Sequence, residues 1–161
     1  MGARVGLGYD SHRFDTGGRL ILAGIFFPDS PGLKAHSDGD AVAHAVTDAI
    51  LGAAALGDIG SHFPPSQAEW RDADSMDLLS RAVDILAAGG WVPSNIDVTV
   101  VCERPRIGPK ALEMRSSLAN VLGLVPEAVS IKGKTNEGMG WIGRGEGIAV
   151  HAVAMIEPDK G

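Results

Sequence analysis

The sequence predicts an α+β fold, a single domain in which helices cover one face of a mixed β-sheet. A length of 161 residues suits one domain with a sizeable core. A content of 45% hydrophobic and 21% charged residues is typical of a folded globular protein. The predicted elements follow the order β-β-β-α-α-β-α-β-β, which favours the α+β class. We therefore treat residues 1–161 as one domain.

The first elements are predicted to be strands. An apolar run at residues 5–7 ends a strand, and residues 20–27 form two short strands around a tight Ala23-Gly24 turn. Residues 28–32 are expected to form a loop. The first helix is then expected from Asp40 to about Leu56, with Asp38 or Asp40 as its N-cap.

The segment at residues 58–67 shows no regular period. Pro64-Pro65 excludes a helix there, so we expect a loop of appreciable length, which is often functional in a compact domain. A second helix is expected after its cap at Asp74-Ser75, and Gly89-Gly90 ends it.

The second half of the chain supplies the remaining strands. Residues 96–100 alternate between apolar and polar side chains and predict a strand. A third helix ends at Gly123, and strands are expected at residues 129–134 and 148–156. These elements complete the predicted mixed sheet.

Composition excludes several classes of partner. The net charge of −6 argues against a broad nucleic-acid surface, so an anionic ligand must be met by local cations or metals. The longest apolar run, around residues 49–56, is too short to span a bilayer. Cys102 is the only cysteine, which excludes an intrachain disulfide, and no signal peptide is visible. We expect a cytoplasmic protein.

One candidate metal site lies at the end of the first strand. In a strand, Asp10 and His12 project from the same face because they are two residues apart. His44 is expected within about one turn of the start of the first helix, where it can face them. Three protein ligands with one open position are the arrangement of a catalytic zinc site. The other interpretation is a surface Asp-His pair and a buried core histidine.

Two loops carry groups that suit phosphates. Thr135 can donate to a phosphate oxygen, and Glu137 can hold a hard cation such as Mg²⁺; a polar turn explains the same residues. The loop at residues 102–108 places Arg104 and Arg106 on a proline-stiffened backbone, which could hold a phosphate, meet a nucleobase or form a solvated turn.

The chain offers no convincing protein nucleophile. It has no Gly-x-Ser-x-Gly motif, and Cys102 has no base near it in the sequence. The glycine-flanked Arg144 is not part of a Walker phosphate loop and is interpreted as an Arg-Glu pair with Glu146. This pattern favours phosphoryl chemistry by positioning and charge neutralisation.

Taken together, these motifs resemble the 2-C-methyl-D-erythritol 2,4-cyclodiphosphate synthase family of the non-mevalonate isoprenoid pathway. The resemblance spans about residues 4–156. Its most specific parts are Gly-Tyr-Asp-Ser-His-Arg-Phe at residues 8–14, Ala-His-Ser-Asp-Gly-Asp at residues 35–40 with His44, and Gly-Arg-Gly-Glu-Gly at residues 143–147.

The resemblance implies a lyase that forms the cyclic diphosphate and releases CMP. The 2-phosphate of 4-diphosphocytidyl-2-C-methyl-D-erythritol 2-phosphate attacks the β-phosphorus of the same molecule. It also implies a homotrimer with its active sites between subunits, and an isoprenoid diphosphate as a further ligand near Arg144 on the threefold axis. The cofactors it implies are one Zn²⁺ per subunit on Asp10, His12 and His44, and Mg²⁺ or Mn²⁺ at Glu137.

The site residues implied by the resemblance form three groups. His36 and Thr135 are the catalytic residues, and the cytidine meets residues 102–108. The substrate-binding set comprises Asp10, His12, His36, Ser37, Asp58, Ile59, Gly60, Phe63, Pro64, Pro65, Ser66, Gln67, Cys102, Glu103, Arg104, Pro105, Arg106, Ile107, Gly108, Lys134, Thr135, Asn136, Glu137, Trp141 and Arg144. A zinc-dependent phosphohydrolase and a non-catalytic metal-binding trimer remain the other hypotheses.

This chain departs from the family pattern at several positions. Pro65-Ser66-Gln67 stands where many members carry acidic residues, in a loop that closes over substrate in the family. Cys102 stands where others often have alanine, and Asn136 where some have threonine. None of these positions is a metal ligand.

Overall fold

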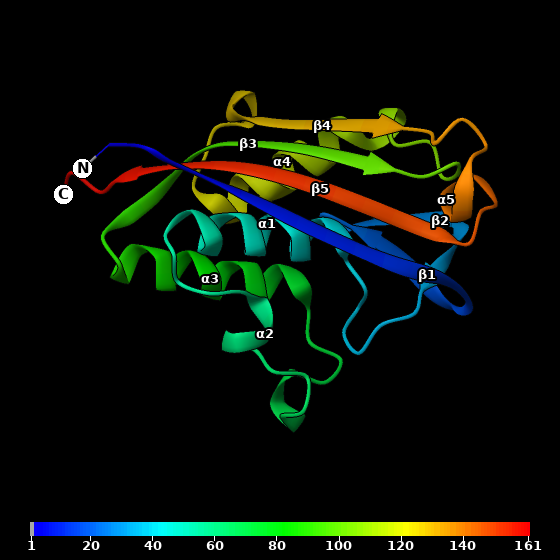
Figure 1. Ribbon diagram of the computed structural model, residues 1–161, viewed down its shortest axis with the longest axis horizontal. Helices are drawn as coiled ribbons and strands as arrows, with labels where there is room; N and C mark the ends of the chain where they lie inside the picture. The colour runs from blue at the N-terminus through cyan, green and yellow to red at the C-terminus, as the bar shows by residue number, and fades with distance from the viewer. Residues whose placement is uncertain (1) are drawn as a thin grey trace.

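A five-stranded sheet with the strand order β2-β1-β5-β3-β4 forms the frame of the protein. The computed structural model describes residues 2–161 (Figure 1). The strands are β1 (Arg4–Leu22), β2 (Ile25–Leu33), β3 (Trp91–Val101), β4 (Val129–Lys134) and β5 (Gly147–Pro158). All neighbouring strands are antiparallel except β3 and β4, so the sheet is mixed as predicted.

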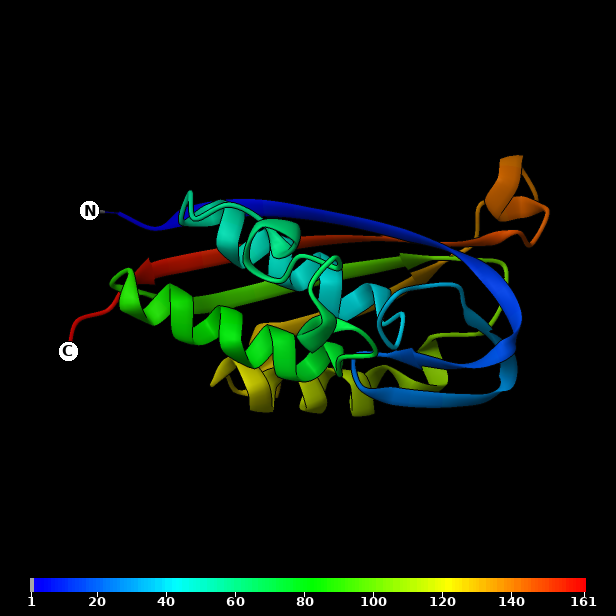
Figure 2. The same ribbon diagram turned by 90° about the horizontal axis from the view of Figure 1, so that it is seen from below.

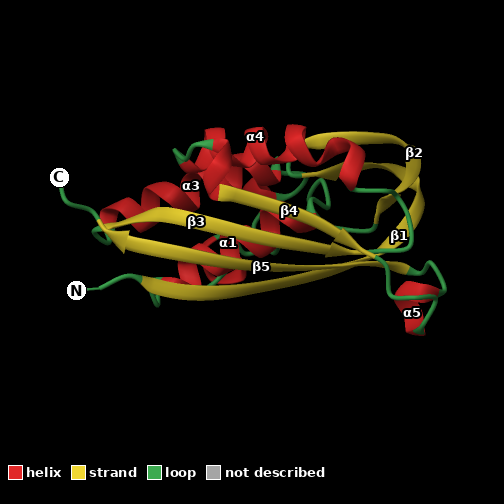
Figure 3. Cartoon of the chain, turned by 90° about the horizontal axis from the view of Figure 1, so that it is seen from above, coloured by secondary structure: helices red, strands yellow, loops and turns green. Residues whose placement is uncertain are grey.

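Three long helices cover one face of this sheet (Figures 2 and 3). They are α1 (Ala41–Ala53), α3 (Ser75–Ala88) and α4 (Ala111–Leu122), and α1 packs mainly on β1 and β5. Two short helices, α2 (Ile59–His62) and α5 (Gly140–Gly143), lie in connections, as do the 3₁₀ turns at Ala68–Trp70, Gly108–Lys110 and Pro126–Ala128. The predicted α+β class is confirmed. No helix within residues 2–161 has the length and apolar character needed to cross a membrane.

The first two predicted strands are one continuous strand, and the predicted loop at residues 28–32 is wrong. Strand β1 runs for 19 residues, turns tightly at Ala23-Gly24 as expected, and returns as β2. Pairs from Leu22 with Ile25 to Phe14 with Leu33 place residues 28–32 inside β2. The prolines are tolerated there because β2 is an edge strand, where a missing N–H breaks no second ladder.

The long loop at residues 58–67 also contains a helical turn that periodicity did not reveal. Asp58 Oδ1 accepts the backbone N–H of Ser61 at 2.8 Å, and Ser61 Oγ accepts the N–H of Asp58 at 3.1 Å. This reciprocal cap holds α2 as a single turn. The first helix ends at Ala53 rather than near Leu56, because Ala55 and Gly57 take positive φ values of 58° and 91°.

Asp40 joins the β1–β2 turn to the start of α1. Its fully buried carboxylate accepts the N–H groups of Ala23 at 2.8 Å, Gly24 at 2.7 Å and Ala43 at 3.0 Å. Burial raises the pKa of this carboxyl to about 6, even though the three N–H bonds favour the anion. Of the two predicted N-caps, Asp40 is the one that caps α1.

The buried Asp40 predicts a measurable pH dependence of stability. As pH rises from 3.8 to about 6, the unfolded chain ionises this carboxyl while the folded protein keeps its proton. Stability from this group therefore falls with rising pH, by on the order of 3 kcal/mol in total, and stays constant outside that window. We expect the free energy of unfolding of the wild type, minus that of Asp40→Asn, to decrease across this range in urea titrations. A difference that does not change with pH would contradict the assignment.

The face of the sheet that the helices leave open carries an apolar stripe. Val5, Leu7 and Tyr9 of β1 are 68%, 67% and 51% exposed, and Val153 of β5 is 41% exposed. Leu7 pairs directly with Val153 in the ladder, so these side chains form one surface. Contiguous exposed apolar surface is typical of surfaces that bind a partner.

Candidate active site

The three predicted metal ligands meet where β1 passes the first turn of α1. Asp10 Oδ2 lies 2.8 Å from His12 Nε2 and 3.1 Å from His44 Nδ1. One ligand atom from each residue falls within 4.8 Å of the others, and all three side chains are partly buried. The expectation that strand alternation and the helix start bring them together is confirmed.

The hydrogen bonds of the outer ring nitrogens suit this cluster to a cation. His12 Nδ1 lies 3.0 Å from the carbonyl oxygen of Lys34, which can only accept, so Nδ1 carries a proton there. Nε2 of His12 is then the ring nitrogen that can offer a lone pair to a cation bound beside Asp10. His44 turns Nδ1 toward Asp10 and places Nε2 2.8 Å from Ser75 Oγ. A carboxylate and two imidazole nitrogens are a donor set that fits zinc.

The pKa shifts of Asp10 and His12 show that the cluster favours positive charge next to an ionised Asp10. Burial by itself would raise the pKa of Asp10, but hydrogen bonds to His12 and His44 outweigh it and hold the pKa below its usual value. Burial by itself would lower the pKa of His12, but the hydrogen bond to Asp10 raises it. The anion at Asp10 therefore favours a positive charge beside it.

Glycine residues on β1 set the distance between strand and helix. Gly6 and Gly8 lie on the same face of β1 as Asp10 and His12, beneath α1. A Cβ atom on Gly8 would overlap the carbonyl oxygen of Ala45, the residue after His44. Close packing at Gly8 therefore keeps His44 within reach of Asp10 and His12.

Gly8→Ala is expected to damage both folding and metal binding. The added methyl group must push α1 away from β1, at a cost of about 1–3 kcal/mol or more in the free energy of unfolding. We expect weaker zinc affinity as well, because His44 moves with the helix. The matched control is Gly52→Ala on α1, where a Cβ meets nothing within 4 Å and helix propensity improves by up to about 1 kcal/mol. Urea unfolding and chelator competition measure the two effects; equal behaviour of both variants would refute this role of Gly8.

A mainly apolar cavity of about 230 Å³ lies beside the triad. Of the predicted substrate-binding residues outside the triad, it is lined by His36, Ser37, Ile59, Gly60, Phe63 and Pro65. Asp58, Pro64, Ser66 and Gln67 do not line it. The structure thus brings predicted residues from two further segments, 36–37 and 59–65, to the metal cluster.

Trp70 is a lining residue of this cavity that sequence reasoning missed. Its ring meets Phe63 edge to face with centroids 5.1 Å apart, and its Nε1–H donates to Gln67 Oε1 at 3.2 Å. The Pro65-Ser66-Gln67 segment, which departs from the family pattern, therefore holds Trp70 through Gln67. A tryptophan among polar residues without regular period was the feature of the sequence that could have indicated a lining residue here.

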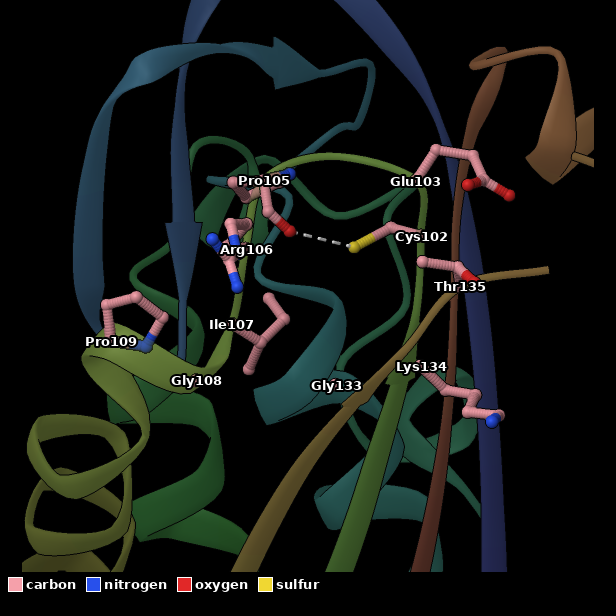
Figure 4. A pocket seen from close by; sticks show the side chains of 10 residues that line it. All are labelled: Cys102, Glu103, Pro105, Arg106, Ile107, Gly108, Pro109, Gly133, Lys134 and Thr135. Carbon is pink, nitrogen blue, oxygen red and sulfur yellow. Dashed lines mark hydrogen bonds between the residues drawn. The ribbon is translucent and has the colours of Figure 1, made fainter. Parts of the chain in front are cut away.

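The predicted nucleotide loop forms a second cavity of about 260 Å³, shown in Figure 4. Its lining combines loop residues with the end of β4: Cys102, Glu103, Pro105, Arg106, Ile107, Gly108, Pro109, Gly133, Lys134 and Thr135. Arg104 instead lines a neighbouring hollow of about 740 Å³ against β2. Gly133 was not predicted; a Cβ there would lie 2.8 Å from that of Ile107, so only glycine lets β4 approach the loop this closely.

Cys102 is unsuited to be a nucleophile. Its thiol is buried, and burial, with a smaller contribution from Glu103, raises its pKa to about 11. Its Sγ donates to the carbonyl oxygen of Pro105 at 3.4 Å (Figure 4). The thiol is thus protonated at neutral pH and shapes the loop.

Glu103 ties this loop to the segment that carries Glu137. Its Oε1 accepts the N–H groups of Asn136 and Gly138, each at 3.1 Å. Glu137 lies between these two anchors with a positive φ of 53°, and its side chain is exposed. Thr135 Oγ1 accepts the N–H of Glu137 at 3.4 Å. The predicted cation ligand is therefore presented to solvent on a fixed turn.

One chain does not bring the two cavities together. They share no lining residue. Asp10 is paired with Val150, Val150 with Val100, and Val100 with Gly133, so three strand spacings, about 14 Å, separate the metal strand from β4. The predicted metal half and nucleotide half therefore lie apart within the chain.

The remaining predicted residues lie just before the start of β5, beside the middle of β1. Trp141 lines a hollow of about 230 Å³ together with Ser11, His12, Arg13 and Glu146. Arg144 Nε donates to Glu146 Oε2 at 2.8 Å, and the Arg144 side chain is largely exposed whereas that of Glu146 is partly buried. The predicted Arg-Glu pair is confirmed.

Comparison with known proteins gives one consistent result over nearly the whole chain. Residues 3–157 match the model of the YgbB family. A 2-C-methyl-D-erythritol 2,4-cyclodiphosphate synthase of Symbiobacterium thermophilum is 54% identical over 152 residues, which cover 94% of this chain and 97% of the relative. The enzyme of the same name from Gemmatimonas aurantiaca is 54% identical over 153 residues, which cover 95% and 92% of the two chains.

Solved structures agree. The bifunctional IspDF of Campylobacter jejuni superposes with a TM-score of 0.93 and 40% identity over 97% of this chain and 42% of that longer one. The CDP complex of IspF from Plasmodium falciparum gives a TM-score of 0.87 and 30% identity over 99% and 98% of the two chains.

Proposed function

The chain belongs to the YgbB family of 2-C-methyl-D-erythritol 2,4-cyclodiphosphate synthases, and we infer that it catalyses the CMP-forming cyclisation for which that family is named. It is then a lyase of isoprenoid precursor biosynthesis. The observation that carries this conclusion is 54% identity to a curated synthase over 94% of the chain, and the convergence of Asp10, His12 and His44 in the structure agrees with it. We propose that residues 1–161 act as one synthase domain.

The proposed substrate is 4-diphosphocytidyl-2-C-methyl-D-erythritol 2-phosphate. An oxygen of its 2-phosphate attacks the β-phosphorus, the bond from that phosphorus to the bridging oxygen breaks, and CMP leaves with the electron pair. Because the nucleophile is already an anion, no strong general base is needed. The barrier is repulsion between anions and the geometry of attack, which a binding site lowers by orientation and charge.

The residues have distinct proposed roles. Asp10, His12 and His44 hold Zn²⁺, which when bound supplies positive charge to the diphosphate. His36 and Ser37 face the phosphates from the cavity beside the triad, and Asp58 with Gly60 meets the erythritol hydroxyls.

On the nucleotide side, residues 102–108 enclose the cytidine, and the exposed Glu137 holds Mg²⁺ or Mn²⁺. With the cytidine in that cavity, Thr135 and Lys134 would contact the diphosphate that is attached to it. The similarity to the Plasmodium falciparum protein, which was solved as a CDP complex, supports a cytidine diphosphate ligand.

We propose that the protein works as a homotrimer in the cytoplasm, with each site between two subunits. The exposed stripe of Val5, Leu7, Tyr9 and Val153 supports association between the sheets of neighbouring subunits. Such contact would remove this apolar surface from water. Separation of the metal half from the nucleotide half supports a site completed by a neighbour. Arg144 is proposed to face an isoprenoid diphosphate at the threefold axis, where symmetry would bring three such cations together.

The test is incubation with the proposed substrate, Zn²⁺ and Mg²⁺, with the products followed by ³¹P NMR and CMP release. We expect CMP and the cyclic diphosphate in equal amounts. CMP with the linear 2,4-bisphosphate, or release of inorganic phosphate from the 2-position, would indicate a phosphohydrolase instead. Binding of CDP without turnover would indicate a metal-binding trimer that is not a catalyst.

A further inference from the structure

We propose that Ser75 and Asp38 are positioning residues, which fix the proton of His44 on Nε2 and so aim the Nδ1 lone pair at the metal. The inference rests on the proposed function, because it concerns the zinc position defined by Asp10, His12 and His44. Neither Ser75 nor Asp38 was singled out as a site residue from the sequence. Both were seen only as capping candidates, and the structure gives them a contact that a cap does not need.

The two ring nitrogens of His44 have opposite surroundings. Nδ1 faces the ligand cluster, 3.1 Å from Asp10 Oδ2 and 3.4 Å from His12 Nε2. Nε2 faces the first residue of α3, with Ser75 Oγ at 2.8 Å and Ser37 Oγ farther away at 3.2 Å. The state of Nε2 therefore decides whether Nδ1 has a lone pair to offer.

The direction of the hydrogen bonds follows from the groups involved. The two oxygens of the Asp38 carboxylate act here as acceptors. The carboxylate accepts the hydroxyl proton of Ser75 on Oδ1 and the backbone N–H of Ser75 on Oδ2 at 3.0 Å. Ser75 has one hydroxyl proton, and Asp38 takes it, so Ser75 Oγ can only accept from His44. Nε2 must then be the protonated nitrogen, which leaves Nδ1 as the nitrogen that can offer its lone pair when a metal binds.

The hydrogen-bonded chain Asp38–Ser75–His44, which we call the relay, is held rigidly by the fold. Ser75 is fully buried at the start of α3, and Asp38 Oδ1 also accepts the N–H of Asp40 at 3.0 Å. Backbone bonds from Asp72 N–H to His36 O at 3.0 Å and from Asp38 N–H to Ala73 O at 3.4 Å join the two segments. Ser75 therefore cannot easily turn away from His44.

His12 shows the same arrangement with a different acceptor. Its outer nitrogen, Nδ1, donates to the carbonyl oxygen of Lys34 at 3.0 Å, which leaves Nε2 for the metal. Each histidine thus has one nitrogen assigned by the protein and one directed into the cluster. Outer partners of this kind orient a ligand histidine, and their loss typically lowers metal affinity about 10–100-fold.

The first experiment measures the zinc dissociation constant by chelator competition for the wild type, Ser75→Ala and Ser80→Ala. Ser80 is the matched control because it lies exposed on the same helix. We expect Ser75→Ala to bind zinc about 10–100-fold more weakly and Ser80→Ala to match the wild type. Asp38→Asn, which removes one acceptor oxygen, should also weaken binding. Urea unfolding of the metal-free proteins establishes that each is folded.

The outcomes separate the two proposals. A wild type that binds no zinc would overturn the proposed metal site, and this inference with it. Strong zinc binding that is equal in the wild type and Ser75→Ala would overturn the inference alone.

A second measurement needs no variant and reads the proton directly. The chain has five histidines, so long-range ¹H–¹⁵N correlation of the zinc-loaded protein can assign each ring. We expect His44 to carry its proton on Nε2 and His12 on Nδ1. A proton on Nδ1 of His44 would refute the relay even if Ser75→Ala fails to fold.

Discussion

Replacement of His44 by alanine is expected to leave the protein without stoichiometric zinc and without turnover. His44 supplies one of three converging ligand atoms, and the two that remain, on Asp10 and His12, are too few to hold the ion against dissociation. With the metal's charge missing from the transition state, CMP release should fall at least about 100-fold. Elemental analysis for zinc and a CMP-release assay measure the two effects on the same preparation.

The matched control for zinc content is His62→Ala. The His62 ring lies 2.6 Å from the carbonyl oxygen of Leu56 and belongs to α2, outside the ligand cluster. It should keep the zinc content of the wild type. Undiminished zinc and activity in His44→Ala would show that the triad is not the metal site.

Two inactive variants should restore activity to each other when they share a trimer. His44→Ala destroys the metal half of a site and leaves its nucleotide half intact, whereas Glu137→Gln does the opposite. If each site joins the metal half of one subunit to the nucleotide half of the next, random mixing in equal amounts gives roughly a quarter of sites with both halves intact. CMP release by the co-refolded mixture should therefore reach about that fraction of the wild type.

Native mass spectrometry must show mixed trimers before the activity is interpreted, and each variant refolded alone gives the baseline. Mixed trimers with no recovered activity would mean that each site lies within one chain. Such a result would leave the cyclisation reaction intact and would reject only the shared site.

The metal triad could be predicted from the sequence because local geometry decides most of it. Alternation along a strand places Asp10 and His12 on one face whatever the strand pairs with. A capping residue at Asp40 fixes where α1 begins, and with it the turn that carries His44. The predicted roles of Thr135 as a phosphate donor and of Glu137 as a cation ligand likewise came from a short polar segment at the end of a strand.

The elements that the sequence did not reveal depend on partners far away in the chain. Residues 28–32 form part of a strand because β1 continues past Phe14 and pairs with β2 along its length. The role of Ser75 exists only because α3 begins beside His44, 31 residues away from it in sequence. Gly133 was overlooked because its missing side chain matters only where β4 meets Ile107.

The sequence by itself therefore determined which side chains could act as metal ligands and where the first helix begins. Short local patterns are enough to identify ligand residues and helix caps. Only the tertiary structure decided which ring nitrogen of each ligand histidine faces the metal position. It also decided that the metal cluster and the predicted nucleotide cavity lie apart within one chain. The Asp38–Ser75–His44 relay and the three strand spacings between Asp10 and Gly133 arise from contacts between segments distant in the chain. Local periodicity carries no information about such contacts, because the free energy that fixes them comes from packing and pairing across the folded chain.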